Sequence, residues 1–394
     1  MISIEEAYQR VINNTELASE ELISVSESLH RRLTRTLEAP IHLPLFDNSA
    51  VDGYALGPNV NPAGATFEIA YEVPAGDTQK RTLNPGEVAR IFTGAPIPEN
   101  TASVVMQEFT QNDGNTVSFA ENTPFKEGNH IRRKGKEVEM GKELFDRGWH
   151  INPATIGFLS SLGIDQVPCY TEPQITILST GNELVEPGKE VKHGEIYESN
   201  CRMLIGALNQ LGIRRIEAQK LGDDLEQTLK TLKAALNQSD YVIISGGISV
   251  GKYDFVKTAN EQLGVESLFY KVRQKPGKPL FFGKKESCLV FALPGNPAAA
   301  LTCFYRYLKP SLEKHGGSKN FDPSFLKLPL QQDFFKKGDR AVMLKASIQN
   351  GSVSLLDGQS SAMLYSFAEA NALVQLPTEE KQYHTGDEVL VIPL

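Results

Sequence analysis

Residues 241–255 read YVIISGGISVGKYDF, and this stretch decides the fold class of the central part of the chain. Tyr241–Ile244 are aromatic or β-branched, which is typical of a buried strand. Gly246 and Gly247 then end the strand, and a polar loop runs as far as Asp254. Because glycine has no Cβ, a ligand can approach the backbone closely at these positions. The stretch therefore predicts a buried strand that ends in a ligand-binding loop.

Strands and helices alternate on both sides of this stretch, from Glu172 to about Asn320. The hydrophobic pattern predicts strands at 174–180, 213–219, 241–244, 267–272, 279–283 and 288–293, and helices at 200–212, 225–238, 255–264 and 296–314. Such alternation predicts a doubly wound α/β domain at 172–320, with a largely parallel sheet and helices on both faces.

The rest of the chain predicts a multidomain α/β + β protein. Residues 1–38 have apolar positions at helical spacing, and 141–171 contain an expected helix beginning near Pro153, so these two segments predict a helical linking region. Residues 39–140 alternate β-type runs with turn residues and predict a β-rich insert domain, with a hairpin turn at 112–115. Residues 321–394 predict a small C-terminal β-barrel domain without helices, with a turn at Asn350–Gly351.

Composition excludes several classes of protein. Lys and Arg number 40 against 48 Asp and Glu, a net charge of −8, which argues against a broad grip on nucleic acid. No apolar run approaches the roughly 18 residues of a membrane span, and the N-terminus fits no targeting peptide, so we expect a cytoplasmic protein. The four cysteines have no C-x-x-C spacing and are expected to be reduced packing residues.

Three polar motifs containing glycine follow expected strands. They are STGNEL at 179–184, SGGISVGKYD at 245–254 and LPGNPAA at 293–299. Ligands of open α/β sheets bind beyond the carboxyl ends of the strands, where exposed backbone N–H groups suit anions. Any one of these loops could be only a tight turn, but three in one sheet predict a ligand that carries phosphate. The absence of G-x-G-x-x-G and of a Walker lysine loop argues against dinucleotide and P-loop binding.

The stretch KVRQKPGKPLFFG (271–283) gathers basic side chains, namely Lys271, Arg273, Lys275 and Lys278. A charge run of this kind is usually a solvated face. The interleaved prolines and glycine are unsuited to an exposed strand or helix, so they favour a rigid loop that presents ammonium groups to an anion.

Carboxylates of interest are Asp52, Glu183, Asp223, Asp224 and Asp254. Carboxylates beside a polyanion repel it unless a cation lies between them, and Mg²⁺ is the natural bridge. Two simpler interpretations stay open. Asp223 or Asp224 could be the N-cap of the helix at 225–238, and Asp52 could be turn material.

Eight motifs occur along the chain in a fixed order: FDNSAVDGYA (46–55), RIFTGAPIP (90–98), HIRRKGKEV (130–138), STGNEL (179–184), GEIYESN (194–200), SGGISVGKYD (245–254), KPGKPLFFG (275–283) and LPGNPAAALTCF (293–304). Together they resemble the molybdopterin molybdenumtransferase family, called MoeA in bacteria and the E domain of gephyrin in animals. The resemblance covers nearly the whole chain. One departure is Glu137, where the family often has Asp, and we leave this position out of the site.

The resemblance implies a homodimer whose α/β domain is like that of the molybdopterin adenylyltransferases. It implies an enzyme that takes adenylylated molybdopterin and molybdate, releases AMP, and leaves molybdenum on the dithiolene sulfurs as the last step of molybdenum cofactor synthesis. The reaction would be assisted by Mg²⁺ or by Zn²⁺. The active site would lie between the α/β domain of one subunit and the β insert of the other.

The resemblance also implies roles for matching residues. Catalytic roles fall on Asp52, Thr93, Glu183, Lys271 and Lys275, with Asp52 and Thr93 coming from the partner subunit. Metal ligation falls on Asp223 and Asp254. The remaining substrate-binding residues are Ser179, Thr180, Gly181, Ser245, Gly246, Gly247, Ser249, Lys278, Pro294, Gly295, Asn296, Pro297, Arg340 and Ser361. Arg340 and Ser361 are looser matches, because the surrounding pattern is weak.

Two alternatives remain. A molybdopterin adenylyltransferase would share the α/β domain, but it would lack the β insert and the C-terminal barrel. A non-catalytic dimeric scaffold would have no need of Asp52, Glu183, Asp254, Lys271 and Lys275 at these points. Expected partners are small-molecule substrates, a second copy of the chain, a molybdopterin adenylyltransferase and the enzymes that accept the finished cofactor.

Overall fold

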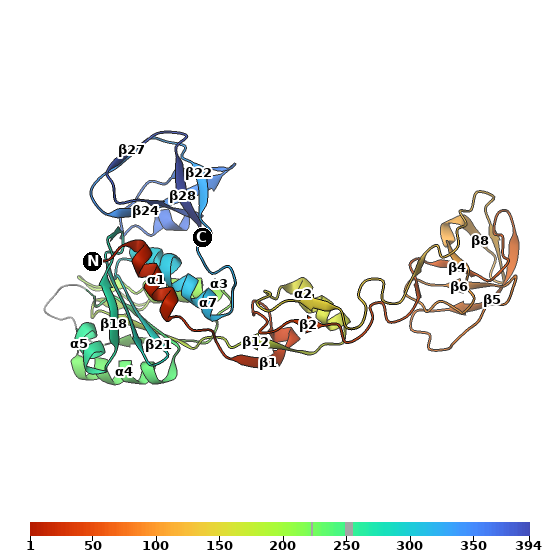
Figure 1. Ribbon diagram of the computed structural model, residues 1–394, viewed down its shortest axis with the longest axis horizontal. Coiled ribbons are helices and arrows are strands. Elements are labelled where there is room, and N and C mark those ends of the chain that lie inside the picture. Colours follow the sequence, from red (N-terminus) through yellow and green to blue (C-terminus); the bar gives the residue numbers. More distant parts are fainter. Residues whose placement is uncertain (222–223, 249–254) are drawn as a thin grey trace. The chain divides into compact units, whose positions relative to one another are not determined.

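The computed structural model describes residues 1–221, 224–248 and 255–394, which form two compact units (Figure 1). Unit 1 contains residues 1–34, 147–152 and 167–394. Unit 2 contains residues 35–146 and 153–166. In the described part of the chain, no helix is both long and apolar enough to cross a membrane.

A six-stranded sheet forms the centre of unit 1. Its order is β16 (Ile216–Leu221), β13 (Ile175–Thr180), β17 (Tyr241–Ser245), β21 (Cys288–Leu293), β20 (Pro279–Lys285) and β18 (Glu266–Lys271). The first four strands are parallel, and the last two are antiparallel to their neighbours. The largely parallel sheet expected from the sequence is therefore confirmed.

Helices cover both faces of this sheet, as the alternation predicted. The helices are α1 (Ile4–Asn14), α3 (Asn200–Gln210), α4 (Leu225–Gln238), α5 (Phe255–Gln262), α6 (Pro297–Cys303) and α7 (Lys309–His315), with a π-helical turn at Phe304–Leu308 between the last two. Tyr241 and Ile243 pack in a core with α1, α3, α6 and α7, whereas Val242 and Ile244 pack in a core with α4 and α5. This alternation follows from the two-residue period of a strand.

The N-terminal segment departs from the sequence-based expectation. The helix expected over residues 1–38 ends at Asn14, and the prediction is wrong beyond it. The chain continues as β1 (Glu20–Ser24), which pairs with β12 (Gln166–Tyr170), and as a short 3₁₀ turn. A partner strand more than 140 residues away overrides the local helical spacing, and no local pattern shows such a partner. The helix expected near Pro153 is present as α2 (Pro153–Ser161).

Unit 2 is built on a six-stranded sheet, in agreement with the expected β-rich insert. Its order is β7 (Ser103–Met106), β4 (Gly53–Leu56), β6 (Val88–Ile91), β5 (Thr66–Val73), β9 (Thr116–Phe119) and β8 (Thr110–Asn112). Two short pairs accompany it, β3 (Asn48–Ser49) with β10 (Ile131–Arg132) and β2 (Leu37–Glu38) with β11 (Glu143–Phe145). The predicted turn at residues 112–115 joins β8 to β9 as an antiparallel hairpin.

The C-terminal part of unit 1 is a second sheet. Its order is β19 (Gln274–Lys275), β24 (Ala341–Gln349), β26 (Ala372–Leu376), β28 (Glu388–Pro393) and β22 (Leu326–Pro329), with β25 (Ser352–Leu355) beside β24 and a separate pair of β23 (Phe334–Lys336) and β27 (Lys381–Tyr383). Asn350 and Gly351 both have positive φ, as the predicted hairpin turn requires. The expectation of no helix here is wrong by one turn, α8 (Tyr365–Ala368).

Arg306 joins three elements of unit 1 in its interior. The side chain is fully buried in the π-helical turn, and its guanidinium lies 4.7 Å from the ring centroid of Tyr8 on α1. Its Nη2 donates to Glu5 at 3.2 Å, and its Nε donates to Gln375 of β26 at 3.2 Å. Its Nη1 is buried and forms no hydrogen bond with the described part of the chain. One side chain thus links the N-terminal helix, the α/β core and the C-terminal sheet.

Candidate functional site

A cavity of about 680 Å³ lies at the carboxyl ends of β13, β17 and β21. The lining residues are Thr180, Gly181, Glu183, Leu184, Ile196, Tyr197, Glu198, Ser199, Asn200, Ser245, Gly246, Gly247, Ile248, Pro279, Pro294, Gly295, Asn296 and Pro297. All three strand-end loops singled out in the sequence therefore open into one cavity. Its described lining carries two carboxylates and no basic side chain.

Glycines let the loops of this cavity approach one another. Gly246 and Gly247 have φ of +87° and +69°, a region that side chains disfavour. A Cβ on Gly246 would lie 2.9 Å from Oγ1 of Thr180, and one on Gly247 would lie 2.7 Å from Cγ2 of Val256. The end of β17 is thus pressed against the end of β13, and glycine is the residue that fits.

Asn200, at the start of α3, ties two of the loops together. Its Nδ2 donates to Oγ of Ser245 at 2.9 Å and to the carbonyl oxygen of Gly295 at 2.7 Å. Its Oδ1 is buried, and none of the residues that the structure describes forms a hydrogen bond with it. The site residues inferred from the sequence did not include Asn200, although it closes the motif GEIYESN. The signal available was the position of a polar motif directly before an expected helix.

Glu198 is a second lining residue that the inferred set lacked. It is buried, and its Oε1 accepts the backbone N–H of Cys201 at 2.8 Å in the first turn of α3. It follows β15 (Ile196–Tyr197), which pairs with β14 (Leu184–Val185). Through that pairing, the segment after Glu183 is held beside the segment before Asn200.

The C-terminal part of unit 1 reaches the cavity at Ser361. Its Oγ accepts a hydrogen bond from Nδ2 of Asn296 at 2.9 Å, and its carbonyl oxygen accepts the N–H of Ala298 at 3.1 Å. The loose match at Ser361 is therefore brought against the cavity-lining loop. Arg340 directly precedes β24, and the N–H of Ala341, the first residue of that strand, donates to the carbonyl oxygen of Arg273 in the lysine-rich stretch.

The lysine-rich stretch borders the cavity through Pro279. Lys271 is the register partner of Pro279 between β18 and β20, and its Nζ lies 5.5 Å from the ring centroid of Tyr270. Lys275 and Lys278 are exposed. The backbone between them is fixed, since Gly277 is buried with φ of +84° and a Cβ there would lie 2.6 Å from Sγ of Cys303. The rigid loop predicted from the prolines and glycine is present only at residues 276–278. The prediction is wrong for Lys271, which ends β18, and for Lys275, which lies in β19.

Other predicted site residues divide into three groups. Ser179 is buried in β13 and is paired with Ser245 rather than lining the cavity. Asp223, Ser249 and Asp254 lie outside the described residues.

Among the residues that are described, no group of three or more His, Cys, Asp or Glu side chains is placed to hold a metal ion. Asp224 caps α4, accepting from the N–H groups of Glu226 and Gln227, which confirms the simpler interpretation for that residue.

Asp52 and Thr93 are brought together within unit 2. Oδ1 of Asp52 accepts the backbone N–H of Thr93 at 2.7 Å and its hydroxyl at 2.8 Å. These two donors, the backbone N–H first, lower the pKa of Asp52 below its usual value. The carboxylate is therefore ionised at neutral pH, and its position is fixed by one neighbour.

We expect Thr93→Val to raise the pKa of Asp52 toward its ordinary value, because one of the two donors is lost. Because the pKa of Asp52 is lower in the folded protein than in the unfolded chain, its ionisation stabilises unit 2 at pH values above the pKa of the unfolded chain, near 4. This contribution disappears as the pH falls through the pKa of the folded protein. Acid unfolding of the variant should therefore begin at slightly higher pH. Carboxyl carbon NMR titration measures the shift, with Thr101→Val, whose hydroxyl donates to Pro98, as the control. An unchanged Asp52 titration would contradict the assignment.

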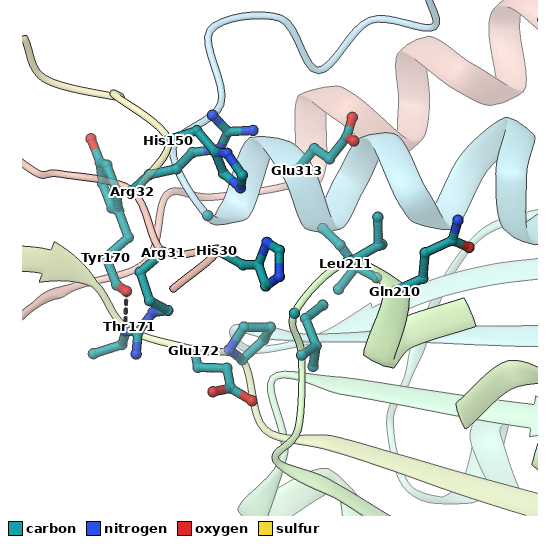
Figure 2. A pocket seen from close by; sticks show the side chains of 15 residues that line it. His30, Arg31, Arg32, His150, Tyr170, Thr171, Glu172, Gln210, Leu211 and Glu313 are labelled. Atoms are coloured by element: carbon teal, nitrogen blue, oxygen red, sulfur yellow. Dashed lines mark hydrogen bonds between the residues drawn. The ribbon is translucent and has the colours of Figure 1, made fainter. Parts of the chain in front are cut away.

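A second cavity, of about 210 Å³, lies elsewhere in unit 1 (Figure 2). The rings of His30 and His150, 5.7 Å apart, are part of its lining. Two of its charged groups already serve the fold, since Glu172 accepts the N–H of Arg215 at 2.7 Å and Arg31 is paired with Glu21. No site residue inferred from the sequence lines it, so we place the candidate site in the larger cavity.

Comparison with known proteins is consistent along the chain. Three family models match in order: the MoeA N-terminal region (domain I and II) at residues 2–163, a probable molybdopterin binding domain at 176–314, and the MoeA C-terminal region (domain IV) at 327–394. A protein of Haemophilus influenzae named molybdopterin molybdenumtransferase is 34% identical, over 100% of this chain and 98% of the relative. The chain belongs to the molybdopterin molybdenumtransferase family.

Two further proteins are similar to this chain over most of its length. The Nostoc sp. relative of that name is 35% identical, over 95% of this chain and 88% of the relative. The crystal structure of the molybdopterin biosynthesis MoeA protein from Pyrococcus horikoshii OT3 gives a TM-score of 0.78 at 27% identity, with 100% of both chains covered. The resemblance seen in the eight motifs and the expected fold class are both confirmed.

Proposed function

We propose that the protein transfers molybdenum from molybdate to adenylylated molybdopterin, releases AMP and forms molybdenum cofactor. Family membership over the full chain supports the reaction class. The observation that carries the proposal is the single cavity into which three glycine-containing loops open. Its volume, about 680 Å³, suits a ligand larger than a nucleotide base alone.

The chain offers two kinds of group to an anionic substrate. Backbone N–H groups at Gly247 and Gly295 would suit phosphate oxygens, since glycine has no side chain. The N–H of Gly246 already donates to the carbonyl oxygen of Leu293 at 3.2 Å. Lys271, the last residue of β18, and Lys275 of β19 would attract molybdate and stabilise the charge that develops as AMP leaves. Lys278 would add a third cation at the edge of the cavity.

A divalent cation fits the charge of this lining. Glu183, Glu198 and Oδ1 of Asn200 are oxygen acceptors at this cavity, and they would repel a substrate rich in phosphate oxygens unless a cation lay between them. We place Mg²⁺, or Zn²⁺ in its stead, near Glu183, with Asp223 and Asp254 as further ligands. When bound, it would neutralise the pyrophosphate and polarise the bond to AMP.

The proposal includes a homodimer. Asp52 of the partner subunit and Thr93 of the partner subunit would complete the site, and the lowered pKa of Asp52 would keep it anionic there. We place the reaction in the cytoplasm, where a molybdopterin adenylyltransferase would supply the substrate and acceptor enzymes would take the product.

The test is AMP release by purified protein given adenylylated molybdopterin, with and without molybdate and Mg²⁺. We expect AMP only when both are present, with molybdenum retained in the pterin product. Pyrophosphate release from ATP and molybdopterin would instead indicate an adenylyltransferase. Tight substrate binding without AMP would sink the transferase proposal and indicate a scaffold or storage role. A Zn²⁺ titration in the same assay compares the two metals.

A further inference from the structure

A buried lysine in the C-terminal sheet organises the loop that carries Ser361. Lys345, on β24, is only 4% exposed. Its Nζ donates to three backbone carbonyls of the loop, those of Gly358, Ser360 (3.3 Å) and Met363 (2.9 Å). One ammonium therefore fixes three points of a segment that has no strand or helix of its own between Leu355 and Tyr365.

Gln359 fixes the same loop to the same strand residue. Its Oε1 accepts the N–H of Lys345 at 2.9 Å, and its Nε2 donates to the carbonyl oxygens of Lys345 at 2.8 Å and of Leu356 at 2.7 Å. Hydrogen bonds to a buried ammonium are stronger than neutral ones, and a buried cation without them is costly. The loop conformation is thus set from inside the C-terminal sheet.

The outer end of this loop meets the cavity. Ser361 lies between the carbonyls that Lys345 holds, and it accepts hydrogen bonds from Asn296 and from the N–H of Ala298. Ala298 belongs to the first turn of α6, whose N–H groups have no partner within the helix. Asn296 and Pro297 line the cavity. The chain of contacts therefore runs from Lys345 through the loop to the cavity wall.

We propose that Lys345 is a positioning residue of the molybdenum-transfer site, which acts on the wall at Asn296–Ala298 through Ser361. The expected effect on the kinetics of AMP release rests on the proposed function, whereas the expected effect on the conformation of the wall does not. Lys345 itself touches no cavity-lining residue by hydrogen bond in the described chain.

The chain offers a matched control in Lys336. This lysine, on β23, is fully buried, and its Nζ donates to the carbonyl oxygens of Gly338 and, at 2.6 Å, of Thr378. It makes the same kind of contact in the same part of unit 1. Its hydrogen-bond partners lie outside the Ser361 loop. If Lys345→Met acted only by destabilising the C-terminal sheet, Lys336→Met should therefore have the same effect.

The experiment compares these two variants in the full-length protein. Amide hydrogen exchange at Ala298 should be about tenfold faster in Lys345→Met and unchanged in Lys336→Met, since one hydrogen bond is worth up to about 1.5 kcal/mol. In the AMP-release assay, Lys345→Met should raise KM by about tenfold with less effect on kcat, because the binding wall is displaced. Lys336→Met should leave both constants unchanged.

Gln359→Ala keeps the Lys345 ammonium and removes the side chain that joins the loop to the backbone of Lys345, so it tests the control of the wall by this loop if Lys345→Met fails to fold. Faster exchange at Ala298 in Gln359→Ala supports the proposal. Equal exchange at Ala298 in Lys345→Met, Lys336→Met and the unmodified protein would overturn it. If the unmodified protein releases no AMP, the proposed function fails, and the exchange measurement still decides whether Lys345 controls the wall.

Discussion

Gly246→Ala is expected to lower AMP release by about 100-fold, because a displacement of about 1 Å in a reacting geometry has that effect. The new Cβ would lie 2.9 Å from Oγ1 and 3.1 Å from the carbonyl oxygen of Thr180. The carbonyl belongs to the end of β13 and has little room to move. The ends of β13 and β17 must therefore separate, and the loops they carry separate with them. Steady-state kinetics of AMP release measures the loss.

The matched control for this prediction is Gly264→Ala. Gly264 has φ of +73°, close to that of Gly246, but a Cβ there meets nothing within 4 Å. Both substitutions cost about 1–3 kcal/mol of backbone strain. Only the first crowds the cavity. If Gly246→Ala retained activity equal to that of Gly264→Ala, the close approach of the two strand ends would not matter for the reaction.

Arg306→Ala is expected to destabilise unit 1 by about 2–4 kcal/mol, the range for truncating a large buried side chain. The change removes the stacking on Tyr8 and the hydrogen bonds to Glu5 and Gln375. It leaves a space where α1, the π-helical turn and β26 meet. Urea unfolding followed by hydrogen exchange in α1 measures the loss, since a two-unit chain need not unfold in one step.

Arg306→Met separates packing from charge in this prediction. Methionine fills most of the space and removes the buried Nη1, which has no hydrogen-bond partner among the described residues. Because Glu5 is 66% exposed, it regains water when the cation is gone. We therefore expect Arg306→Met to cost less than about 1.5 kcal/mol, as buried ion pairs can be replaced by apolar residues at small cost. Equal losses in both variants would show that the charge, rather than the packing, holds this junction.

Local patterns in the sequence predicted the central sheet well, for a physical reason. A strand such as Tyr241–Ser245 is apolar on both faces because helices cover both, and its end is marked by glycines that approach Thr180. Alternating strands and helices leave few arrangements of a parallel sheet. The strand-end loops then had to meet at one edge.

Contacts between distant segments could not be predicted in this way. Asn296 and Ser361 are 65 residues apart, and their hydrogen bond depends on how the C-terminal sheet docks on α6. The hydrogen bonds of Asn200 to Ser245 and Gly295 likewise depend on the fold, which brings these residues together. In the same way, β1 became a strand because β12 is its neighbour. A single sequence carries such information only through the finished fold.

The pairing of β19 with β24 limits how the gene for this protein can recombine. Gln274 and Lys275 belong to the lysine-rich loop of the α/β part, yet their strand is an edge of the C-terminal sheet. A recombination event that exchanged residues 321–394 for an unrelated domain would keep the three glycine-containing loops of the cavity and Lys271, Lys275 and Lys278. It would nevertheless remove β24, the strand that pairs with Gln274 and Lys275. The α/β part and the C-terminal part can therefore be transferred to another protein only together, as one segment of the gene.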